Sequence, residues 1–327
     1  MCGIVGYVGN KTAVDILLEG LTSLEYRGYD SSGIAVNVEG KVELYKAAGK
    51  LQNLKDIVEK NYAEISKSTI GIGHIRWATH GAPTVENPHS CNCGKVAVVH
   101  NGIIENYKEL RAKLEAKGCT FRSQTDTETV AHLVATKYGE THDLTEAVRL
   151  ATKEIEGAYA LCVIHQDVPN TIVATRRNAP LVVGLGEGEN FVASDVPALI
   201  QYTKKAMYLD DNQIVTLKPD SYKVIDIDKN PLTLKVETLP WEPVALSKMG
   251  YKHFMLKEIH EQPDVVRNVL SGKLHAMDED IILKEVTLDK DKLKNLSRIQ
   301  IVACGTSLHA AMVGKYLIED FCGIPVD

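Results

Sequence analysis

The sequence predicts a layered α+β fold, followed by the start of an α/β unit. Over the first two thirds of the 327 residues, candidate strands cluster, then candidate helices, and then strands again. This order lacks the regular strand–helix alternation that a doubly wound parallel sheet requires. Near residue 239 the composition changes, because Leu239-Pro240-Trp241-Glu242-Pro243 carries two prolines and is typical of a linker. A strand–turn–helix pattern close to the end of the chain then indicates the α/β unit.

Runs rich in Val, Ile and Tyr, separated by Gly, Asn and Asp, predict the strands of the first part. The earlier strands are Gly3–Val8, Gly33–Val38, Thr69–Thr79 and Lys95–Gly102. The later strands are Tyr159–His165, Thr171–Arg176, Leu181–Gly186, Phe191–Ser194, Gln213–Leu217 and Tyr222–Ile227.

Amphipathic patterns predict helices over Thr12–Tyr26, Glu105–Lys117, Thr127–Tyr138 and Leu144–Glu156. In the first of them, Leu17, Leu21 and Leu24 recur at a helical spacing and form one apolar face. The segment Thr125-Asp126-Thr127-Glu128 has the pattern of a capping box, which predicts the start of the third helix.

Beyond the linker, the polar segment Tyr251–Leu270 has a helical pattern, and Pro263 predicts a break or a helix start within it. A buried strand is predicted over Ile299–Ala303, a turn over Cys304–Ser307 and a helix over Leu308–Asp320. One βα unit cannot bury both faces of a parallel strand by itself. We therefore expect this second domain to be incomplete in the chain, or to dock on another surface.

Composition and charge exclude several classes of protein. Lys and Arg total 37 and Asp and Glu total 43, so the formal net charge is −6, and the isoelectric point is near 6.0. This balance argues against a nucleic-acid or anionic-lipid partner. No apolar run approaches the ~20 residues that span a membrane, and the first residues lack the pattern of a secretory signal. The seven cysteines, an odd number, predict free thiols in a reducing cytoplasm.

Cys2 is the first candidate for chemistry. Removal of Met1, which a small following residue favours, places a free α-amine and a thiol on the same residue. In peptides the pKa of an α-amine is about 7.7–8.0 and that of a thiol is about 8.5. The amine can therefore be neutral at working pH and take the thiol proton, directly or through a water. The alternative interpretation is a small buried hydrophobic residue at the start of the chain.

Polar segments adjoin the predicted strands, and together they supply what a thiol that cleaves an amide needs. These segments are Arg27–Gly33, Arg76–Gly81, His100–Gly102 and Ser123–Asp126. An arginine can bind a substrate carboxylate through two hydrogen bonds, and an aspartate can bind an ammonium group. An asparagine side chain and a glycine N–H can stabilise a tetrahedral oxyanion. Each segment also has an ordinary explanation as a turn, a cap or a surface arginine.

With Cys2-Gly3-Ile4-Val5-Gly6 and Gln124-Thr125-Asp126-Thr127-Glu128, these segments resemble the class II glutamine amidotransferases. Within that class the sequence is similar to the glutaminase half of the glutamine–fructose-6-phosphate aminotransferases (isomerizing transaminases, or glucosamine-6-phosphate synthases). The resemblance spans residues 2 to about 240 and continues in Lys257–Pro263. It ends in Cys304–Ser307, which is similar to the opening of the family's sugar-isomerase (SIS) domain.

The resemblance implies an N-terminal nucleophile hydrolase fold, a four-layer α-β-β-α sandwich with two stacked antiparallel sheets, followed by an incomplete α/β SIS domain. It implies a glutaminase domain over residues 2–238, a linker over 239–252 and a truncated SIS domain over 253–327. The implied reaction is hydrolysis of glutamine to glutamate and ammonia through a γ-glutamyl thioester. In the complete family protein, which we expect to be a homodimer, the ammonia converts fructose 6-phosphate to glucosamine 6-phosphate for hexosamine biosynthesis. We expect this chain alone to supply the glutaminase half.

The resemblance also assigns roles to individual residues. It implies that Cys2 is the nucleophile, and that Asn101 and Gly102 form the oxyanion hole. For glutamine binding it implies Arg76 at the α-carboxylate, Asp126 at the α-ammonium group, and Thr79 and His80 in the loop above the substrate. It implies Trp77 at an ammonia gate, Arg27 in a nearby mobile segment, and Thr306 and Ser307 as ligands of a sugar phosphate. The family needs neither a metal ion nor a redox cofactor.

Several other interpretations stay open at this point. The segment His89-Ser90-Cys91-Asn92-Cys93 has zinc-like spacing, but a surface loop is favoured because no second pair completes four ligands. Oxidation sensitivity of its two cysteines is a further hypothesis. A metal at His74 and His80 lacks a carboxylate at a suitable offset. For the whole chain, the alternatives are a free-standing glutaminase or other class II amidotransferase, and a non-catalytic binding module.

Overall fold

The computed structural model describes residues 2–76, 90–239, 251–270, 274–275, 280–281, 293 and 295–327. The chain divides into two compact units, Met1–Ser247 and Lys248–Asp327, and each is described by itself. Among the described residues, no helix combines the length and the apolar character that crossing a membrane requires.

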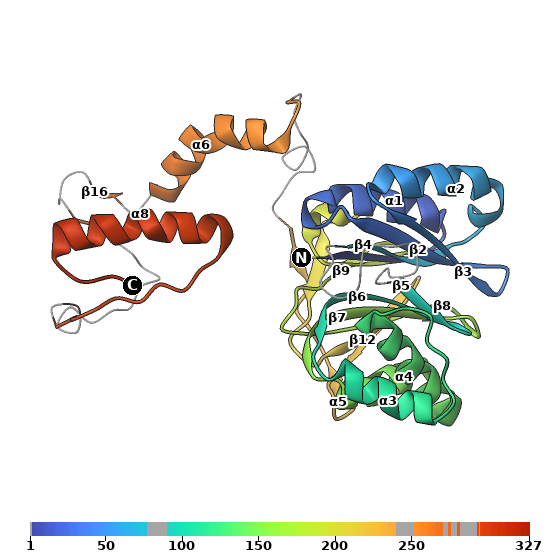
Figure 1. The fold of residues 1–327 in the computed structure, drawn as a ribbon. Coiled ribbons are helices and arrows are strands. Elements are labelled where there is room, and N and C mark those ends of the chain that lie inside the picture. Colours follow the sequence, from blue (N-terminus) through green and yellow to red (C-terminus); the bar gives the residue numbers. More distant parts are fainter. Residues whose placement is uncertain are drawn as a thin grey trace. The chain divides into compact units, whose positions relative to one another are not determined.

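Two antiparallel sheets form the centre of the first unit (Figure 1). Among the described residues the first sheet has eight strands, in the order β15-β11-β9-β10-β1-β4-β2-β3. Their bounds are β1 Gly3–Val8, β2 Ser31–Val38, β3 Lys41–Ala48, β4 Ile70–Arg76, β9 Val182–Leu185, β10 Asn190–Ala193, β11 Lys205–Tyr208 and β15 Glu237–Thr238.

The second sheet has seven strands within the described part of the chain, in the order β14-β13-β12-β8-β7-β6-β5. Their bounds are β5 Ser90–Cys93, β6 Val96–Ile104, β7 Gly157–His165, β8 Val168–Arg177, β12 Ile214–Lys218, β13 Ser221–Ile225 and β14 Pro231–Leu232.

Helices cover the outer face of each sheet (Figure 1). Helices α1 (Ala13–Ser23) and α2 (Leu51–Ile65) lie on the first sheet. Helices α3 (Tyr107–Ala116), α4 (Asp126–Thr141) and α5 (Leu144–Glu154) lie on the second. The layers therefore run helix, sheet, sheet, helix, and the predicted α-β-β-α sandwich is confirmed.

The central strands are buried on both faces, which explains why their sequences are almost continuously apolar. In β1, Val5 and Tyr7 pack toward α1 and α2, whereas Ile4 and Val8 pack between the two sheets. Gly6 shares the face of Ile4, and a Cβ atom there would lie 2.9 Å from the sulfur of Cys162 on β7. The absence of a side chain at Gly6 thus lets the two sheets approach each other.

The sequence predicted the buried strands of the first unit well, and its errors there include an edge strand, one whole helix and the end of another helix. Strand β1 has the predicted bounds, whereas the edge strand β3 and the helix α2 were not predicted. Strand β3 carries charged residues and is mostly half-buried, so it lacks the apolar run of a central strand. The first predicted helix is wrong at its end, because α1 stops at Ser23 and a 3₁₀ turn, η1, follows over Glu25–Arg27.

The second unit contains helices α6 (Phe254–Leu270) and α8 (Gly305–Cys322) and the short pair β16 (Leu274–His275) and β17 (Asp280–Ile281). The predicted break at Pro263 is wrong, since α6 continues through this residue. Proline removes the N–H that would bond the carbonyl of Ile259. Ile259 is exposed, so water can bond that carbonyl instead.

The strand predicted over Ile299–Ala303 is reduced to an isolated parallel bridge between Ile299 and Val326. The N–H of Ile301 also donates to the carbonyl of Asp327, at 2.8 Å. The prediction of burial is wrong here, because Val302 is 99% exposed. No residue of α8 is buried either, and its apolar side chains have no second layer of the described unit over them.

We predict that Gly6→Ala lowers the free energy of unfolding by about 1–3 kcal/mol, because the added methyl group overpacks the contact with Cys162. Urea unfolding followed by circular dichroism measures this change. Gly139→Ala is the matched control: it lies in α4 with no atom within 4 Å of the new Cβ, and we expect no loss. Equal losses in both variants would contradict the close approach of the sheets at Gly6.

Candidate active site

The candidate residues of the first sheet lie at one end of two neighbouring strands. Cys2 directly precedes β1, and Arg76 is the last residue of β4. The antiparallel register pairs Gly3 with Ile75, so Cys2 and Arg76 are the next residues at that end of the pair. Both are buried, with exposed fractions of 3% and 0%.

Arg27, on the turn that follows α1, holds the main chain of Cys2. Its Nε donates to the carbonyl oxygen of Cys2 at 3.0 Å, and its Nη1 lies 3.5 Å from Oδ2 of Asp195. The hydroxyl of Tyr26 donates to the same oxygen of Asp195. The guanidinium is only 7% exposed, so its position relative to Cys2 is fixed by packing as well as by charge.

Ser194 connects the start of β1 to the second sheet, and no pattern in the sequence predicts this role. Its N–H donates to the carbonyl of Ile4, and its Oγ accepts the N–H of Ile4, both at 3.0 Å. The same Oγ accepts a hydrogen bond from Nδ2 of Asn101 at 3.3 Å. Asn101 therefore lies beside the strand that begins directly after Cys2.

Gly102 follows Asn101 on β6 and occupies a position that only glycine fits. Its φ is +136°, and a Cβ atom there would lie 2.0 Å from the carbonyl oxygen of Ala158 on β7. An L-residue would have to break the β6–β7 pairing to avoid this contact. The requirement is therefore structural, and it applies whatever chemistry the Gly102 N–H performs.

Asp126 lies fully buried at the first position of α4 and joins that helix to the end of β6. Its Oδ2 accepts the N–H of Ile104 at 2.9 Å, and its Oδ1 accepts the N–H of Thr127 at 3.0 Å. His100 Nδ1 is 3.8 Å from Oδ2. A carboxylate at this place is stabilised by the positive end of the helix dipole.

Two buried histidines, His100 and His74, lie near these groups, and both are packed inside the protein. His100 Nδ1 is 3.2 Å from Oγ1 of Thr127, and its side chain is completely buried. Burial, followed by the charges of His100 and Arg76, lowers the pKa of His74 well below its usual range. His74 is therefore neutral at physiological pH, which suits a core residue.

The remaining predicted site residues fall into two groups. Trp77, Thr79 and His80 lie outside the described residues. Thr306 and Ser307 lie in the first turn of α8, in the second unit, and are exposed.

Among residues whose side chains are described, no three His, Cys, Asp or Glu side chains are grouped so as to hold a metal ion. His89 and the side chain of Cys91, from the zinc-like segment, are not among them.

The side chain of Glu128 stabilises the turn that leads into α4, and its hydrogen bonds differ from those of the predicted capping box. Thr125 is the N-cap, but its side chain makes no capping hydrogen bond. Glu128 instead accepts the N–H of Arg122 at 2.8 Å, and the N–H and Oγ of Ser123 at 2.6 and 2.8 Å. Burial opposes ionisation, but these bonds and His132, 3.8 Å away, lower the pKa of Glu128 to about 2.

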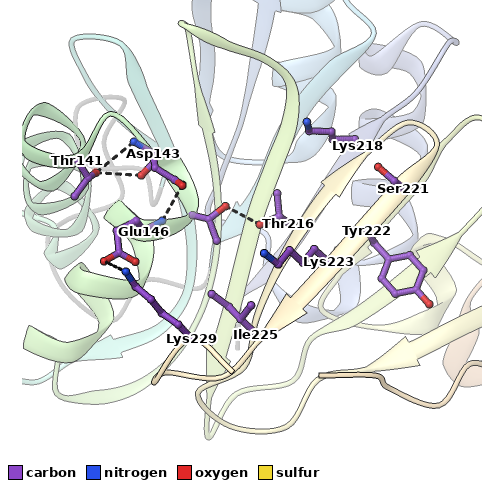
Figure 2. Close-up of a pocket in the computed structure, with 11 residues that line it drawn as sticks. Thr141, Asp143, Glu146, Thr216, Lys218, Ser221, Tyr222, Lys223, Ile225 and Lys229 are labelled. Carbon is purple, nitrogen blue, oxygen red and sulfur yellow. Dashed lines mark hydrogen bonds and ion pairs between the residues drawn. The ribbon is translucent and has the colours of Figure 1, made fainter. Parts of the chain in front are cut away.

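Two surface hollows differ in their relation to the candidate residues. One of about 190 Å³ is lined by Arg27, Ser194 and Asp195, and so adjoins the start of β1. The other, of about 680 Å³, lies on the second sheet and contains none of the candidate residues (Figure 2). In it, Lys229 is already paired with Glu146 at 2.8 Å.

The sequence profile of the glutamine amidotransferase domain matches residues 58–241. The chain belongs to the glutamine amidotransferase family. Among curated relatives, the glutamine–fructose-6-phosphate aminotransferase [isomerizing] of Caldanaerobacter subterraneus subsp. tengcongensis is 50% identical over all of this chain and 53% of its own length. The enzyme of the same name from Aquifex aeolicus is 49% identical, again over all of this chain and 53% of its own length. The chain thus spans about half the length of the curated relatives it matches.

Two solved structures share the fold of this amidotransferase unit. The glutamine phosphoribosylpyrophosphate amidotransferase of B. subtilis, solved with ADP and GMP, has a TM-score of 0.57 at 26% identity. A structure described as the allosteric regulatory enzyme of purine biosynthesis has a TM-score of 0.58 at 27% identity. Each match covers 70% of this chain and 50% of the other chain.

For the amidotransferase unit, we predict that Glu128→Gln lowers the free energy of unfolding at pH 7 by on the order of 2–3 kcal/mol. The pKa of Glu128 is depressed in the fold from 4.5 to about 2, so its contribution is complete above pH 4.5 and is lost as the pH falls toward 2. Urea unfolding at several pH values should show the difference between variant and parent closing over this interval.

Glu140→Gln, on the exposed end of the same helix, is the matched control and should change stability by less than about 0.5 kcal/mol. A deficit of Glu128→Gln that is the same at pH 3 and pH 7 would contradict an ionised carboxylate at the turn.

Proposed function

We propose that this chain hydrolyses the side-chain amide of glutamine, with Cys2 as the nucleophile. The observation that supports this most directly is the set of hydrogen bonds made by Ser194. They bring the amide of Asn101, an oxyanion donor in the proposal, beside the strand that starts after Cys2. When a thiol cleaves an amide, its sulfur attacks the carbonyl carbon while hydrogen-bond donors stabilise the carbonyl oxygen, so both groups must lie near the same carbonyl.

In the proposed reaction, removal of Met1 exposes the α-amine of Cys2, which takes the proton from the thiol. The thiolate attacks the carboxamide carbon, and the oxyanion accepts hydrogen bonds from Asn101 Nδ2 and the Gly102 N–H. Ammonia leaves with the proton that the amine supplies, and a γ-glutamyl thioester remains. Water then hydrolyses the thioester and releases glutamate.

Buried charges bind the two ends of the amino acid in this proposal. Arg76 binds the α-carboxylate, and Asp126 binds the α-ammonium group. Both side chains are completely buried, so the charges act in a medium of low polarity where their attraction is stronger than in water. Thr79 and His80 line the loop above the substrate, and Trp77 and Arg27 control the passage of ammonia. Arg27 donates a hydrogen bond to the carbonyl of Cys2, so it is in direct contact with the nucleophilic residue.

For the whole protein, we propose that the ammonia aminates fructose 6-phosphate, which is isomerised to glucosamine 6-phosphate. The curated relatives named for this reaction are about twice as long as the chain. Residues 2–238 are then the glutaminase domain, 239–252 the linker and 253–327 the first part of the sugar-isomerase domain. Thr306 and Ser307 bind the phosphate at the start of α8, where N–H groups and the helix dipole favour an anion. The complete enzyme is a homodimer that acts in the cytoplasm.

We predict that the chain releases glutamate from glutamine, and that Cys2→Ala reduces this turnover by at least about 10³-fold because the nucleophile is lost. Glutamate release and mass spectrometry of the N-terminus are measured on the same preparation. Cys322→Ala is the matched control, because it removes an exposed thiol at the far end of α8. Undiminished turnover in Cys2→Ala would disprove the assignment of Cys2 as the nucleophile.

The same assay separates the alternatives. A non-catalytic binding module would bind glutamine in calorimetry without turnover, even with Met1 removed. A free-standing glutaminase would release glutamate but would form no amino sugar from fructose 6-phosphate when the second half of a curated relative is added.

We predict that Asn101→Ala lowers kcat by about 10²–10³-fold with little change in KM, because the lost donor acts on the oxyanion and not on bound glutamine. Steady-state kinetics of glutamate release measure both constants. Thermal unfolding of the variant controls for the lost hydrogen bond to Ser194. A fall in kcat/KM that comes from KM alone would place Asn101 in substrate binding instead.

A further inference from the structure

Cys93, which has no role in the proposed glutamine hydrolysis, is paired with a histidine. Cys93 is the last residue of β5, at the edge of the second sheet. Its sulfur lies 3.0 Å from Nδ1 of His132 on α4. The other ring nitrogen of His132, Nε2, lies 3.8 Å from Oε1 of Glu128, one helical turn earlier. The three side chains form a row of thiol, imidazole and carboxylate.

Neighbouring groups fix the imidazole and favour its charged form. The ring of Phe121 lies against the His132 ring, with the centroids 4.3 Å apart and the planes tilted by 39°, and the guanidinium of Arg111 on α3 covers the same phenyl ring. Burial disfavours the charge, but the hydrogen bond with Cys93 and the Glu128 carboxylate at 3.8 Å outweigh burial and raise the pKa of His132 to about 10. The partners of His132 therefore favour its charged form despite burial.

The position of Cys93 combines access with a charged partner. Its side chain is half-buried, unlike that of a core thiol. Cys162 is fully buried, which raises the pKa of its thiol and makes it inert. Cys304 and Cys322 are the reverse case, exposed thiols in the second unit. A cation within hydrogen-bond distance of an accessible thiol favours the thiolate, which is the reactive form.

We propose that Cys93, held by His132 and oriented through Glu128, is a nucleophilic thiolate and a site of oxidation by peroxides. The thiolate sulfur attacks one oxygen of hydrogen peroxide, so an S–O bond forms and the O–O bond breaks. The sulfur loses two electrons, and the departing hydroxide takes a proton from solvent or from His132 to become water. The product is the sulfenic acid of Cys93, which a thiol reductant returns to the thiol.

The arrangement fits this chemistry better than a purely structural contact. Glu128 lies at one nitrogen of the imidazole while the other faces the sulfur, which is the geometry that fixes a histidine beside a nucleophile. Glu128 is itself held by the N–H groups of Arg122 and Ser123. The proposal does not depend on glutamine hydrolysis, because none of its groups is assigned to that reaction.

Alkylation by iodoacetamide, resolved by peptide mass spectrometry, tests the thiolate in the full chain. A Cys91→Ser background leaves one thiol in the relevant peptide. At pH 6 we expect a faster rate at Cys93, which has the His132 contact, than at Cys304 and Cys322, and we expect the ratio of the rates to fall as the pH rises. An ordinary thiol is only about 3% ionised at pH 7 and less at pH 6, while the nucleophilicity of a thiolate falls with its pKa, so the advantage of Cys93 over these more exposed thiols should be largest at pH 6.

The ionisable groups that act on His132 are Cys93, Glu128 and Cys119, and Arg111 on α3 lies over the neighbouring Phe121 ring. We expect His132→Asn to lower the rate at Cys93 at pH 7 to that of the exposed thiols. Cys162 reports the fold within the same experiment, since it is labelled only on unfolding. A Cys93 rate that rises with pH in parallel with Cys304 and Cys322 in the parent chain would overturn the proposal without any variant.

Oxidation is then tested with hydrogen peroxide followed by dimedone, which traps sulfenic acids. The proposal is supported if dimedone traps Cys93 at lower peroxide concentrations than Cys304 and Cys322. When dimedone is omitted, dithiothreitol should return the oxidised Cys93 to the thiol. Trapping at the exposed thiols but not at Cys93 would overturn its oxidation step.

Discussion

The hydrogen bonds of Ser194 join the two sheets at the end of the sandwich where the candidate residues meet. A single hydroxyl accepts from the main chain of β1 and from the side chain of Asn101 on β6. These bonds have a defined geometry only because the sheets are packed closely, which the absence of a side chain at Gly6 permits. The position of the proposed oxyanion donor relative to Cys2 is therefore a property of the sheet packing.

Local sequence pattern predicted the fold where burial dominates. Strand β1 is apolar on both faces, and its bounds were predicted without error. The edge strand β3 was missed because its charged, half-buried residues give no apolar run. The capping box correctly predicted the helix start, with Thr125 as N-cap, but its hydrogen bonds are absent because Glu128 accepts from the preceding turn instead, at Arg122 and Ser123. Such competition depends on the folded turn and is invisible in the spacing.

The site could be predicted only as far as its residues lie in recognisable motifs. Cys2, Asn101 and Asp126 stand in such segments, whereas Ser194 follows an ordinary strand, β10, and bonds to a residue 190 positions away in the chain. Long-range contacts of this kind leave no periodicity in the sequence. The pair of Cys93 and His132 is a similar case, because its members come from a strand and a helix 39 positions apart. The sequence raised oxidation of Cys93 as a hypothesis but could not name its partner.

The pairing of β1 with β10 has a consequence for synthesis on the ribosome. Val5 pairs with Ala193, and Ile4 bonds to Ser194, so the first strand lacks one neighbour until some 190 residues have been made. At about 5–20 residues per second this takes roughly 10–40 s. Cys2 becomes buried only when the finished sheet closes around it. The aminopeptidase that would remove Met1 thus has an interval of this length in which the N-terminus is still accessible.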